Sequence, residues 1–337
     1  MEFEQLAEKV MSGNYLTRPE LDRFAYLVQQ ERINDGQFVA MLTAMQTRDE
    51  IKGRSIDECG NFVDAFRQRS DVLIEGVLCN SGTGGDRVKT LNISTPASIV
   101  IASAGIPVLK TGSKGTTGSK GSREAFEALG LKPLEGLDRV IASTQDIGIG
   151  YYDFSKIIPL HGRSGLRTPL NYMGPLCHPT KLTNKVLGCA DETYAIDASR
   201  ILDTGITENY LISFNPDVDE ISLAGQTRVI VKRNGERLEF NFDPQEEGLP
   251  RVPYSKVAKM DDFERGTDRI VRSLQGEEPD VRYFIAVNAG AGIYLADKAK
   301  SISEGFELAN SLMESGKAYA KLEEWRAYQN ERKRKNI

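Results

Sequence analysis

Glycine, hydroxyl and lysine residues gather in two segments that have the composition of anion-binding loops. The first is Ser81-Gly-Thr-Gly-Gly-Asp86, and the second, residues 110–122, consists only of lysine, glycine, serine and threonine. Glycine lets backbone amides converge on an anion, and phosphate is the usual guest of such loops. Neither segment is a Walker loop or a GxGxxG motif, so the alternatives are a tight turn for the first and a flexible linker for the second.

A third polar segment, Asn92-Ile-Ser-Thr-Pro96, lies at the start of a predicted helix, with Thr95 as the expected cap and Pro96 in the first turn. Free backbone amides and the helix dipole favour anions at such a position. A plain helix cap is the alternative, but it would need only one of the three polar side chains. Taken together, the three segments predict one site for a ligand that carries several phosphates.

Two adjacent carboxylates, Asp219 and Glu220, follow a predicted strand that ends near Phe214. Neighbouring acidic residues in a loop are commonly just solvated charges. Beside a polyphosphate site, however, their oxygen atoms are suitable ligands for Mg²⁺. We therefore predict that they bind the metal.

The overall composition excludes several other functions. With 43 basic and 48 acidic side chains the net charge is −5, which argues against binding to nucleic acid or to a membrane surface. No apolar run reaches membrane-spanning length, and the N-terminus resembles no signal peptide, so a cytoplasmic location is expected. The four cysteines are far apart, which argues against disulfides or a zinc site. His178 is expected to be structural, and the basic end, residues 331–337, to be solvated.

The hydrophobic pattern predicts an α/β fold. Residues 1–70 have the 3.6-residue period of consecutive helices, with capping boxes at Thr17–Glu20 and Ser55–Glu58. After Asp71, strands alternate with loops and helices, as in a domain with a mostly parallel central sheet. Arg233-Asn-Gly-Glu236 predicts a hairpin, and the apolar run 282–287 predicts a buried strand.

The motifs, in their order along the chain, resemble those of the anthranilate phosphoribosyltransferase family. The matching segments are Gly82-Thr-Gly-Gly-Asp86, Asn92-Ile-Ser-Thr95, Lys110-x-Gly112, Ala128-Leu-Gly130, Gly165-Leu-Arg-Thr168, Asn171-x-x-Gly-Pro175, Asp219-Glu220 and the stretch from Asn288 to Leu322. The resemblance implies a small all-helical domain, residues 1–70 plus about 152–185. It also implies a larger α/β domain, about 71–151 plus 186–337, and a homodimer formed through the helical domain.

The resemblance further implies that the ligand is 5-phosphoribosyl-1-pyrophosphate (PRPP) with Mg²⁺. No catalytic acid or base is implied, because positioning and charge neutralisation would do most of the work. The residues implied for PRPP binding are Gly82, Thr83, Gly84, Gly85, Asp86, Asn92, Ser94, Thr95, Lys110, Ser119 and Lys120, and those implied for the metal are Ser94, Asp219 and Glu220.

The acceptor side departs from the family pattern. Where the family has Lys-His-Gly-Asn-Arg, this chain has Lys110-Thr-Gly-Ser-Lys114, and His161 replaces the arginine expected to meet the anthranilate carboxylate. We therefore expect a phosphoribosyltransferase whose acceptor is a nitrogen of an aromatic or heterocyclic compound other than anthranilate. The predicted acceptor-binding residues are Thr111, Gly112, Ser113, His161, Arg163 and Arg167.

Three alternatives stay open at this point. The first is a genuine anthranilate phosphoribosyltransferase of tryptophan biosynthesis, in which the substitutions are tolerated. The second is an enzyme like the pyrimidine nucleoside phosphorylases, which share the fold. The third is a non-catalytic relative that binds nucleic acid, for which the acidic net charge is unfavourable.

Overall fold

The computed structural model describes residues 2–67, 74–112, 121–153 and 168–335. The described strands are β1 (Leu78–Gly82), β2 (Val108–Gly112), β3 (Ile149–Asp153), β4 (Leu182–Cys189), β5 (Thr207–Phe214), β6 (Thr227–Arg233) and β7 (Glu236–Phe242). The described helices are α1 (Phe3–Met11), α2 (Arg18–Gln29), α3 (Asp35–Lys52), α4 (Ile56–Ala65), α5 (Ser94–Ser103), α6 (Ser122–Ala128), α7 (Leu137–Ile147), α8 (Leu170–Met173), the 3-10 turn η2 (Gly174–Leu176), α9 (Glu192–Asp203), α10 (Tyr254–Val257), α11 (Phe263–Leu274), α12 (Pro279–Leu295), α13 (Ile302–Glu314) and α14 (Lys317–Lys335).

The seven described strands form one sheet in the order β3-β2-β1-β4-β5-β6-β7. The first five are parallel, and β6 and β7 continue the sheet as an antiparallel hairpin. The predicted hairpin turn is confirmed, with Asn234 and Gly235 both in the left-handed region that this tight turn requires. The mostly parallel α/β fold is therefore confirmed.

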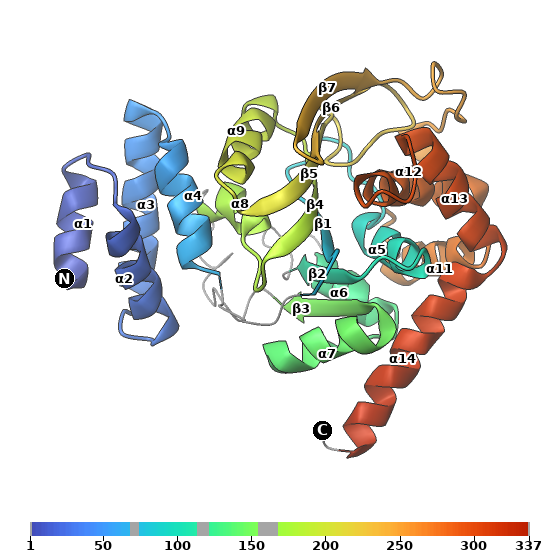
Figure 1. Cartoon of the computed structure of the whole chain (residues 1–337), viewed down its shortest axis with the longest axis horizontal. Helices are drawn as coiled ribbons and strands as arrows, with labels where there is room; N and C mark the ends of the chain where they lie inside the picture. The colour runs from blue at the N-terminus through green and yellow to red at the C-terminus, as the bar shows by residue number, and fades with distance from the viewer. Residues whose placement is uncertain (1, 68–73, 113–120, 154–167, 336–337) are drawn as a thin grey trace.

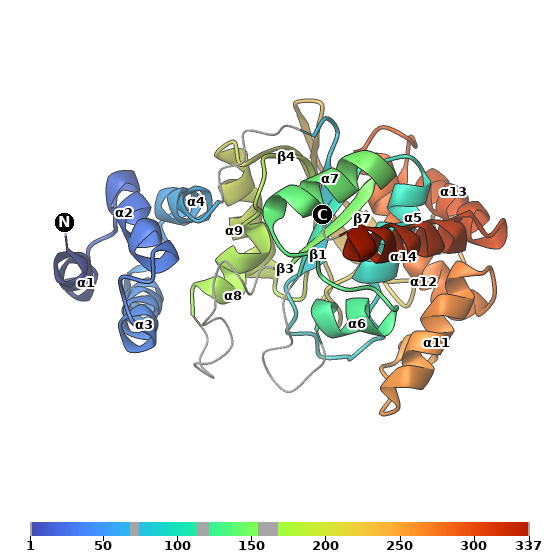
Figure 2. The ribbon, with the colours of Figure 1, turned by 90° about the horizontal axis from the view of Figure 1, so that it is seen from below.

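Helices cover both faces of the sheet, as parallel strands require (Figures 1 and 2). One hydrophobic cluster joins one face of the sheet to α5, α12, α13 and α14. A second cluster joins the opposite face to α7 and α9 and continues into α1–α4 at the N-terminal end of the molecule. The predicted boundary between two domains stays a prediction, because the second cluster runs from these helices to the sheet without a break. In the described part of the chain, no helix is both long and apolar enough to cross a membrane.

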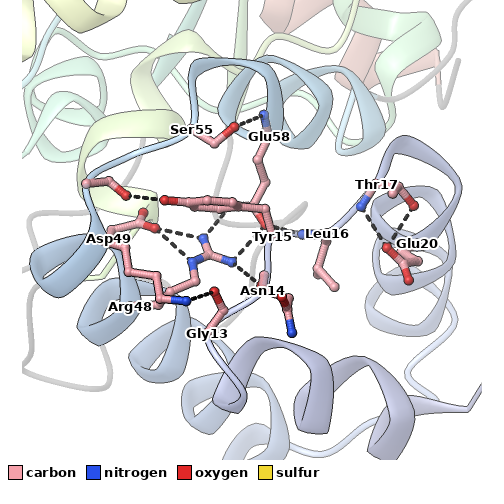
Figure 3. A network of polar contacts seen from close by, with 12 residues as sticks. Gly13, Asn14, Tyr15, Leu16, Thr17, Glu20, Arg48, Asp49, Ser55 and Glu58 are labelled. Carbon is pink, nitrogen blue, oxygen red and sulfur yellow. Dashed lines mark hydrogen bonds and ion pairs between the residues drawn. The ribbon is translucent and has the colours of Figure 1, made fainter.

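The two predicted capping boxes have different outcomes. At the start of α2 the Glu20 carboxylate accepts a hydrogen bond from the Thr17 amide (2.7 Å), so this box is confirmed. At the start of α4 the Ser55 hydroxyl accepts from the Glu58 amide (3.2 Å), but the Glu58 carboxylate does not return the contact. It accepts instead from the Leu16 amide (2.6 Å) and from a buried arginine (Figure 3). The second box is therefore only half formed.

That arginine, Arg48, holds a buried ionic network inside the helical region (Figure 3). Its guanidinium pairs with Asp49 (2.7 Å) and with Glu58, and all three side chains are almost fully buried. Burial raises the pKa of Glu58, with the hydrogen bonds from Arg48 opposing it. Tyr172 of α8 donates to the free oxygen of Asp49 (2.8 Å), so the network also attaches α8 to α3.

Replacing Tyr172 by phenylalanine is expected to destabilise the protein by about 1–2 kcal/mol, because one buried oxygen of Asp49 loses its donor. Urea unfolding monitored by circular dichroism measures this. Tyr26→Phe is the matched control, since this tyrosine is 45 % exposed and its substitution should change stability by less than about 0.5 kcal/mol. Equal stability of both variants would contradict the assigned contact.

The predicted strand at 282–287 is wrong, because these residues lie in the middle of α12. The run is apolar on every side because α12 is buried between α5 and α13, so no helical period is visible in the sequence. Close packing explains the glycines of this region: a Cβ on Gly290 would lie 2.5 Å from the Phe306 amide nitrogen of α13.

Candidate active site at the carboxyl edge of the sheet

The predicted phosphate and metal residues that the structure describes meet at the carboxyl ends of the central parallel strands. The glycine loop, residues 82–86, continues from β1 at the middle of the sheet, and Lys110 lies near the end of the neighbouring β2. The acidic pair follows β5, and α5 begins after the glycine loop. In open α/β sheets this edge is where ligands bind. Segments as far apart as residues 84 and 219 are in contact here.

The glycine loop packs directly on the acidic loop. The Gly84 amide donates to Oδ2 of Asp219 (2.6 Å). A Cβ on Gly82 would lie only 2.0 Å from the same oxygen, so any side chain there would displace the carboxylate. Gly84 and Gly85 have φ angles of 67° and 87°, in the left-handed region that favours glycine. The glycines are therefore needed both for the turn and for the close approach of the carboxylate.

Three carboxylates crowd together where these loops meet. Burial, and then the charge of Asp86, raise the pKa of Asp219 to about 7. Burial, and then the charges of Asp219 and Asp86, raise the pKa of Glu220 well above its ordinary value. One oxygen of Asp86 is buried without a hydrogen-bond partner. The carboxylate oxygens are hard ligands, and their negative charges repel one another. A divalent cation such as Mg²⁺ fits such an arrangement.

The carboxylates are not a complete metal site by themselves. Among the residues that the structure describes, no three histidine, cysteine or acidic side chains are arranged to hold a metal ion together. Mg²⁺ commonly keeps several waters and shares one or two carboxylates with substrate phosphates. Asp219 and Glu220 are therefore suited to bind the metal jointly with a phosphorylated ligand rather than alone.

Asn288 on α12 fixes the acidic loop from behind. Its side-chain oxygen accepts from the Ile221 amide (2.9 Å) and its nitrogen donates to the Ile221 carbonyl (3.1 Å). The backbone of residue 221, next to Glu220, is thus held on both sides. The sequence motifs placed Asn288 in the family pattern but assigned it no contact with the site.

The start of α5 differs from the expectation in one detail. Thr95 was predicted to cap this helix, but Oδ1 of Asn92 accepts from the Thr95 amide (3.2 Å) and α5 begins at Ser94. The hydroxyl of Thr95 is buried and has no hydrogen-bond partner. Because Asn92 performs the capping, the hydroxyls of Ser94 and Thr95 are not needed for it. Both are predicted phosphate-binding residues.

Lys110 contributes a buried ammonium group to the same edge. Its side chain is 1 % exposed, and Nζ donates to the Asn80 carbonyl (3.0 Å) and to Oγ of Ser94 (3.2 Å). Burial lowers the pKa of Lys110 to about 8, so the group remains largely protonated at neutral pH.

Asn80, which sequence reasoning missed, links the strand to the helix. Its side-chain nitrogen donates to the Ser94 carbonyl (2.9 Å), and its side-chain oxygen accepts from Ser98. The signal available in the sequence was a polar residue in a central strand, directly before the Ser81–Asp86 segment. Asn80 is buried there.

The acceptor side is only partly described. Thr111 is buried with its hydroxyl 3.6 Å from the Cys79 sulfur, and Gly112 pairs with Asp153 of β3. The other predicted acceptor residues lie outside the described residues, as do two predicted PRPP residues: Ser113, His161, Arg163, Arg167, Ser119 and Lys120. His178 is buried and bonds backbone and hydroxyl groups of Leu109 and Thr180, in agreement with a structural role.

The arrangement combines backbone amides, a lysine and hydroxyl groups with a carboxylate pair on one sheet edge. The first group of donors can hold phosphate oxygens, and the carboxylates can hold a divalent cation. The site is therefore suited to a group transfer in which a charged phosphate leaving group is bound and neutralised.

Comparison with known proteins agrees with this chemistry. Residues 75–319 match the family described as "Glycosyl transferase family, a/b domain". An anthranilate phosphoribosyltransferase of Pyrobaculum arsenaticum is 31 % identical, over 96 % of this chain and 98 % of that protein.

Solved structures give the same result. The anthranilate phosphoribosyltransferase of Thermus thermophilus superposes with a TM-score of 0.85 at 27 % identity and covers 96 % of this chain and 99 % of its own. The Saccharomyces cerevisiae enzyme in complex with PRPP and Mg has the same fold, with a TM-score of 0.81 at 20 % identity and 98 % of each chain covered.

Proposed function

Because this chain belongs to the anthranilate phosphoribosyltransferase family of glycosyl transferases, we propose that it moves the 5-phosphoribosyl group of PRPP to the amino nitrogen of anthranilate. The observation that carries the proposal is the convergence of the glycine loop, the start of α5, Lys110 and the acidic pair at one edge of the sheet. These are the groups that a donor with a pyrophosphate and a separate phosphate needs.

Different described residues would bind different parts of PRPP. Residues 82–86 would line the pyrophosphate, with the Gly84 amide already bonded to Asp219 and the Thr83 amide to the Gly188 carbonyl. The side chains of Asn92, Ser94, Thr95 and Lys110 would bind phosphate and ribose. The partnerless hydroxyl of Thr95 supports this assignment, since a buried hydroxyl without a partner is unfavourable unless a ligand completes it. Ser119 and Lys120 stay predictions.

Mg²⁺ fits the crowded carboxylates of Asp219 and Glu220, with Ser94 as a predicted further ligand. When bound, it would neutralise charge on the leaving pyrophosphate. The protein's own contribution is to hold the donor. The raised pKa values of both carboxyl groups support the fit, because a cation would relieve the repulsion that raises them.

In the reaction, the bond between C1 of the ribose and the pyrophosphate oxygen breaks, and positive charge develops at C1. The amino nitrogen of the acceptor forms the new bond to C1 and releases one proton to pyrophosphate or water. We assign no general base, so catalysis would rest on orientation and on neutralising the leaving group.

For the acceptor, the known relatives favour anthranilate over our first expectation. The departures at Thr111, Ser113 and His161 pointed to a different aromatic or heterocyclic amine. The relatives at 31 % and 27 % identity, which align over almost the whole chain, are both named anthranilate phosphoribosyltransferases. We therefore propose that this chain tolerates these substitutions and accepts anthranilate.

The homodimer implied by the resemblance also stays a proposal, which multi-angle light scattering tests.

Two measurements test the function separately. Calorimetric titration with PRPP should give saturable binding in the presence of Mg²⁺ and much weaker binding with a chelator present; no binding in either buffer would refute use of the donor. Chromatographic assay should then show N-(5-phosphoribosyl)anthranilate formed together with pyrophosphate. If PRPP binds but anthranilate is not consumed, while another aromatic amine releases pyrophosphate, the donor assignment stands and the acceptor assignment is wrong.

A further inference from the structure

A second buried lysine, Lys185, lies on the opposite side of β1 from Lys110. It belongs to β4, its side chain is 1 % exposed, and Nζ donates to the Ser81 hydroxyl (2.8 Å) and to the Cys79 sulfur (3.5 Å). Among the described residues, none of its hydrogen bonds goes to a carboxylate. Burial disfavours the charged form of a lysine, and a negative partner offsets that cost.

Cys79 is the group placed to be that partner. It is fully buried in β1, in register with Lys185 of β4, and its sulfur also lies 3.6 Å from the Thr111 hydroxyl. The Lys185 ammonium group and the Thr111 hydroxyl can both donate to a thiolate at this sulfur. A neutral buried cysteine, in contrast, is usually surrounded by apolar side chains.

We propose that Cys79 is a thiolate in the folded protein and that it is the counter-ion that holds Lys185 against Ser81, at the start of the phosphate-binding loop. Cys79 and Lys185 are then positioning residues, because neither touches the glycines that bind the donor. The sulfur holds the Lys185 ammonium group in place, and Lys185 in turn fixes the Ser81 hydroxyl next to Gly82.

The other charged groups around the sulfur agree with this state. The titratable groups that face it are Lys185 of β4, His178 in the segment before β4 and Lys110 of β2. Burial alone raises a thiol pKa, but the charge of Lys185, followed by the hydrogen bond from His178 and the charge of Lys110, outweighs it, so the pKa of Cys79 lies well below its ordinary value. The direction of this shift supports an ionised sulfur beside Lys185.

The remaining cysteines provide an internal control. Burial raises the pKa of Cys59, Cys177 and Cys189, so all three are neutral thiols at neutral pH. Any thiolate seen in the folded protein at neutral pH therefore belongs to Cys79.

The first test is the ultraviolet absorbance of the thiolate in the folded wild-type protein, measured from acidic to alkaline pH. We expect the signal of one thiolate per chain at neutral pH, its loss in Cys79→Ser, and its loss at neutral pH in Lys185→Met. A wild-type protein whose thiolate signal develops only at alkaline pH would overturn the proposal. The wild-type titration decides the question even if a variant fails to fold.

The second test concerns the consequence for PRPP and rests on the proposed function. Cys79→Ser should raise KM for PRPP by about tenfold with little change in KM for anthranilate, because the start of the loop is no longer held in place. Cys79→Asp restores a negative charge beside Lys185 and should return KM to within about threefold of wild type. A Cys79→Ser enzyme with wild-type KM would overturn the positioning role. If wild-type protein does not bind PRPP at all, the proposed function fails, whereas the absorbance still decides whether Cys79 is a thiolate.

Discussion

Replacing Asp219 by asparagine is expected to lower kcat/KM for PRPP by about 100-fold or more and, in Mg²⁺-free buffer, to raise the unfolding temperature. Activity falls because one of the two carboxylates proposed to bind the metal is lost. Stability rises because the substitution removes a charge that the folded state holds unfavourably, since burial and Asp86 raise the pKa of this carboxyl to about 7.

The pH dependence of the stability gain follows from the direction of that shift. Between the ordinary carboxyl pKa and about 7, the folded state holds a proton on Asp219 that the unfolded state has released, so wild-type stability falls as pH rises through this window. The gain in Asp219→Asn should therefore be largest near pH 8 and absent near pH 4. Solvent screens this partly exposed carboxylate. We therefore expect a gain of about 1 kcal/mol in the free energy of unfolding, or about 2–4 °C in the unfolding temperature.

A matched control lies two residues away. Asp217→Asn removes the same charge from the same loop, but the Asp217 carboxylate has no assigned role. The Asp217 carbonyl accepts from the Val88 amide (2.9 Å) and its amide donates to Oδ1 of Asn215 (2.9 Å), so the backbone makes these contacts. It should leave kcat/KM within about twofold of wild type. Steady-state kinetics and differential scanning fluorimetry measure both variants. If Asp217→Asn lost as much activity as Asp219→Asn, the effect would be general loop damage and the metal assignment would be wrong.

Much of the phosphate side of the site could be predicted from the sequence because its constraints are local. Gly84 and Gly85 need a left-handed backbone, and the segment from Asn92 to Thr95 lies at a helix start, so both features are visible in consecutive residues. The order of strands and helices was predictable for the same reason. The exchange of roles between Asn92 and Thr95 shows the limit, because the helix starts at Ser94 instead of Pro96, and this shift of two residues changes which side chain caps it.

What the sequence did not reveal depends on partners that are distant in the chain. Glu58 has the right position for a capping box, but the buried Arg48 and the Leu16 amide bind its carboxylate instead. The pairing of Cys79 with Lys185 needs the register between β1 and β4, which no local pattern encodes. The helix at 282–287 looked like a strand because burial on all sides removes the helical period.

The second large effect is expected for Gly188→Ala. Gly188 lies on β4 opposite Gly82, and a Cβ at this position would lie 1.6 Å from the Asp219 carbonyl oxygen and 2.6 Å from its carbonyl carbon. Backbone atoms cannot rotate away as a side chain can. The acidic loop is also held nearby, by Asn288 at residue 221, so it has little freedom to retreat. We therefore expect destabilisation by about 3 kcal/mol and loss of Mg²⁺-dependent PRPP binding.

Two further glycine variants separate the steric effect from the loss of the site. In Gly82→Ala the atoms nearest to the added Cβ belong to the Asp219 carboxylate, with Oδ2 at 2.0 Å. This variant should therefore abolish PRPP binding in calorimetry, while its free energy of unfolding in urea stays close to that of wild type. Gly225→Ala has no atom within 4 Å of the added Cβ and should change neither quantity. Wild-type PRPP affinity in Gly82→Ala would mean that the position of the Asp219 carboxylate is unimportant for binding. Wild-type PRPP affinity together with wild-type stability in Gly188→Ala would refute the packing of the acidic loop on β4, because the added methyl group leaves no space for the Asp219 carbonyl.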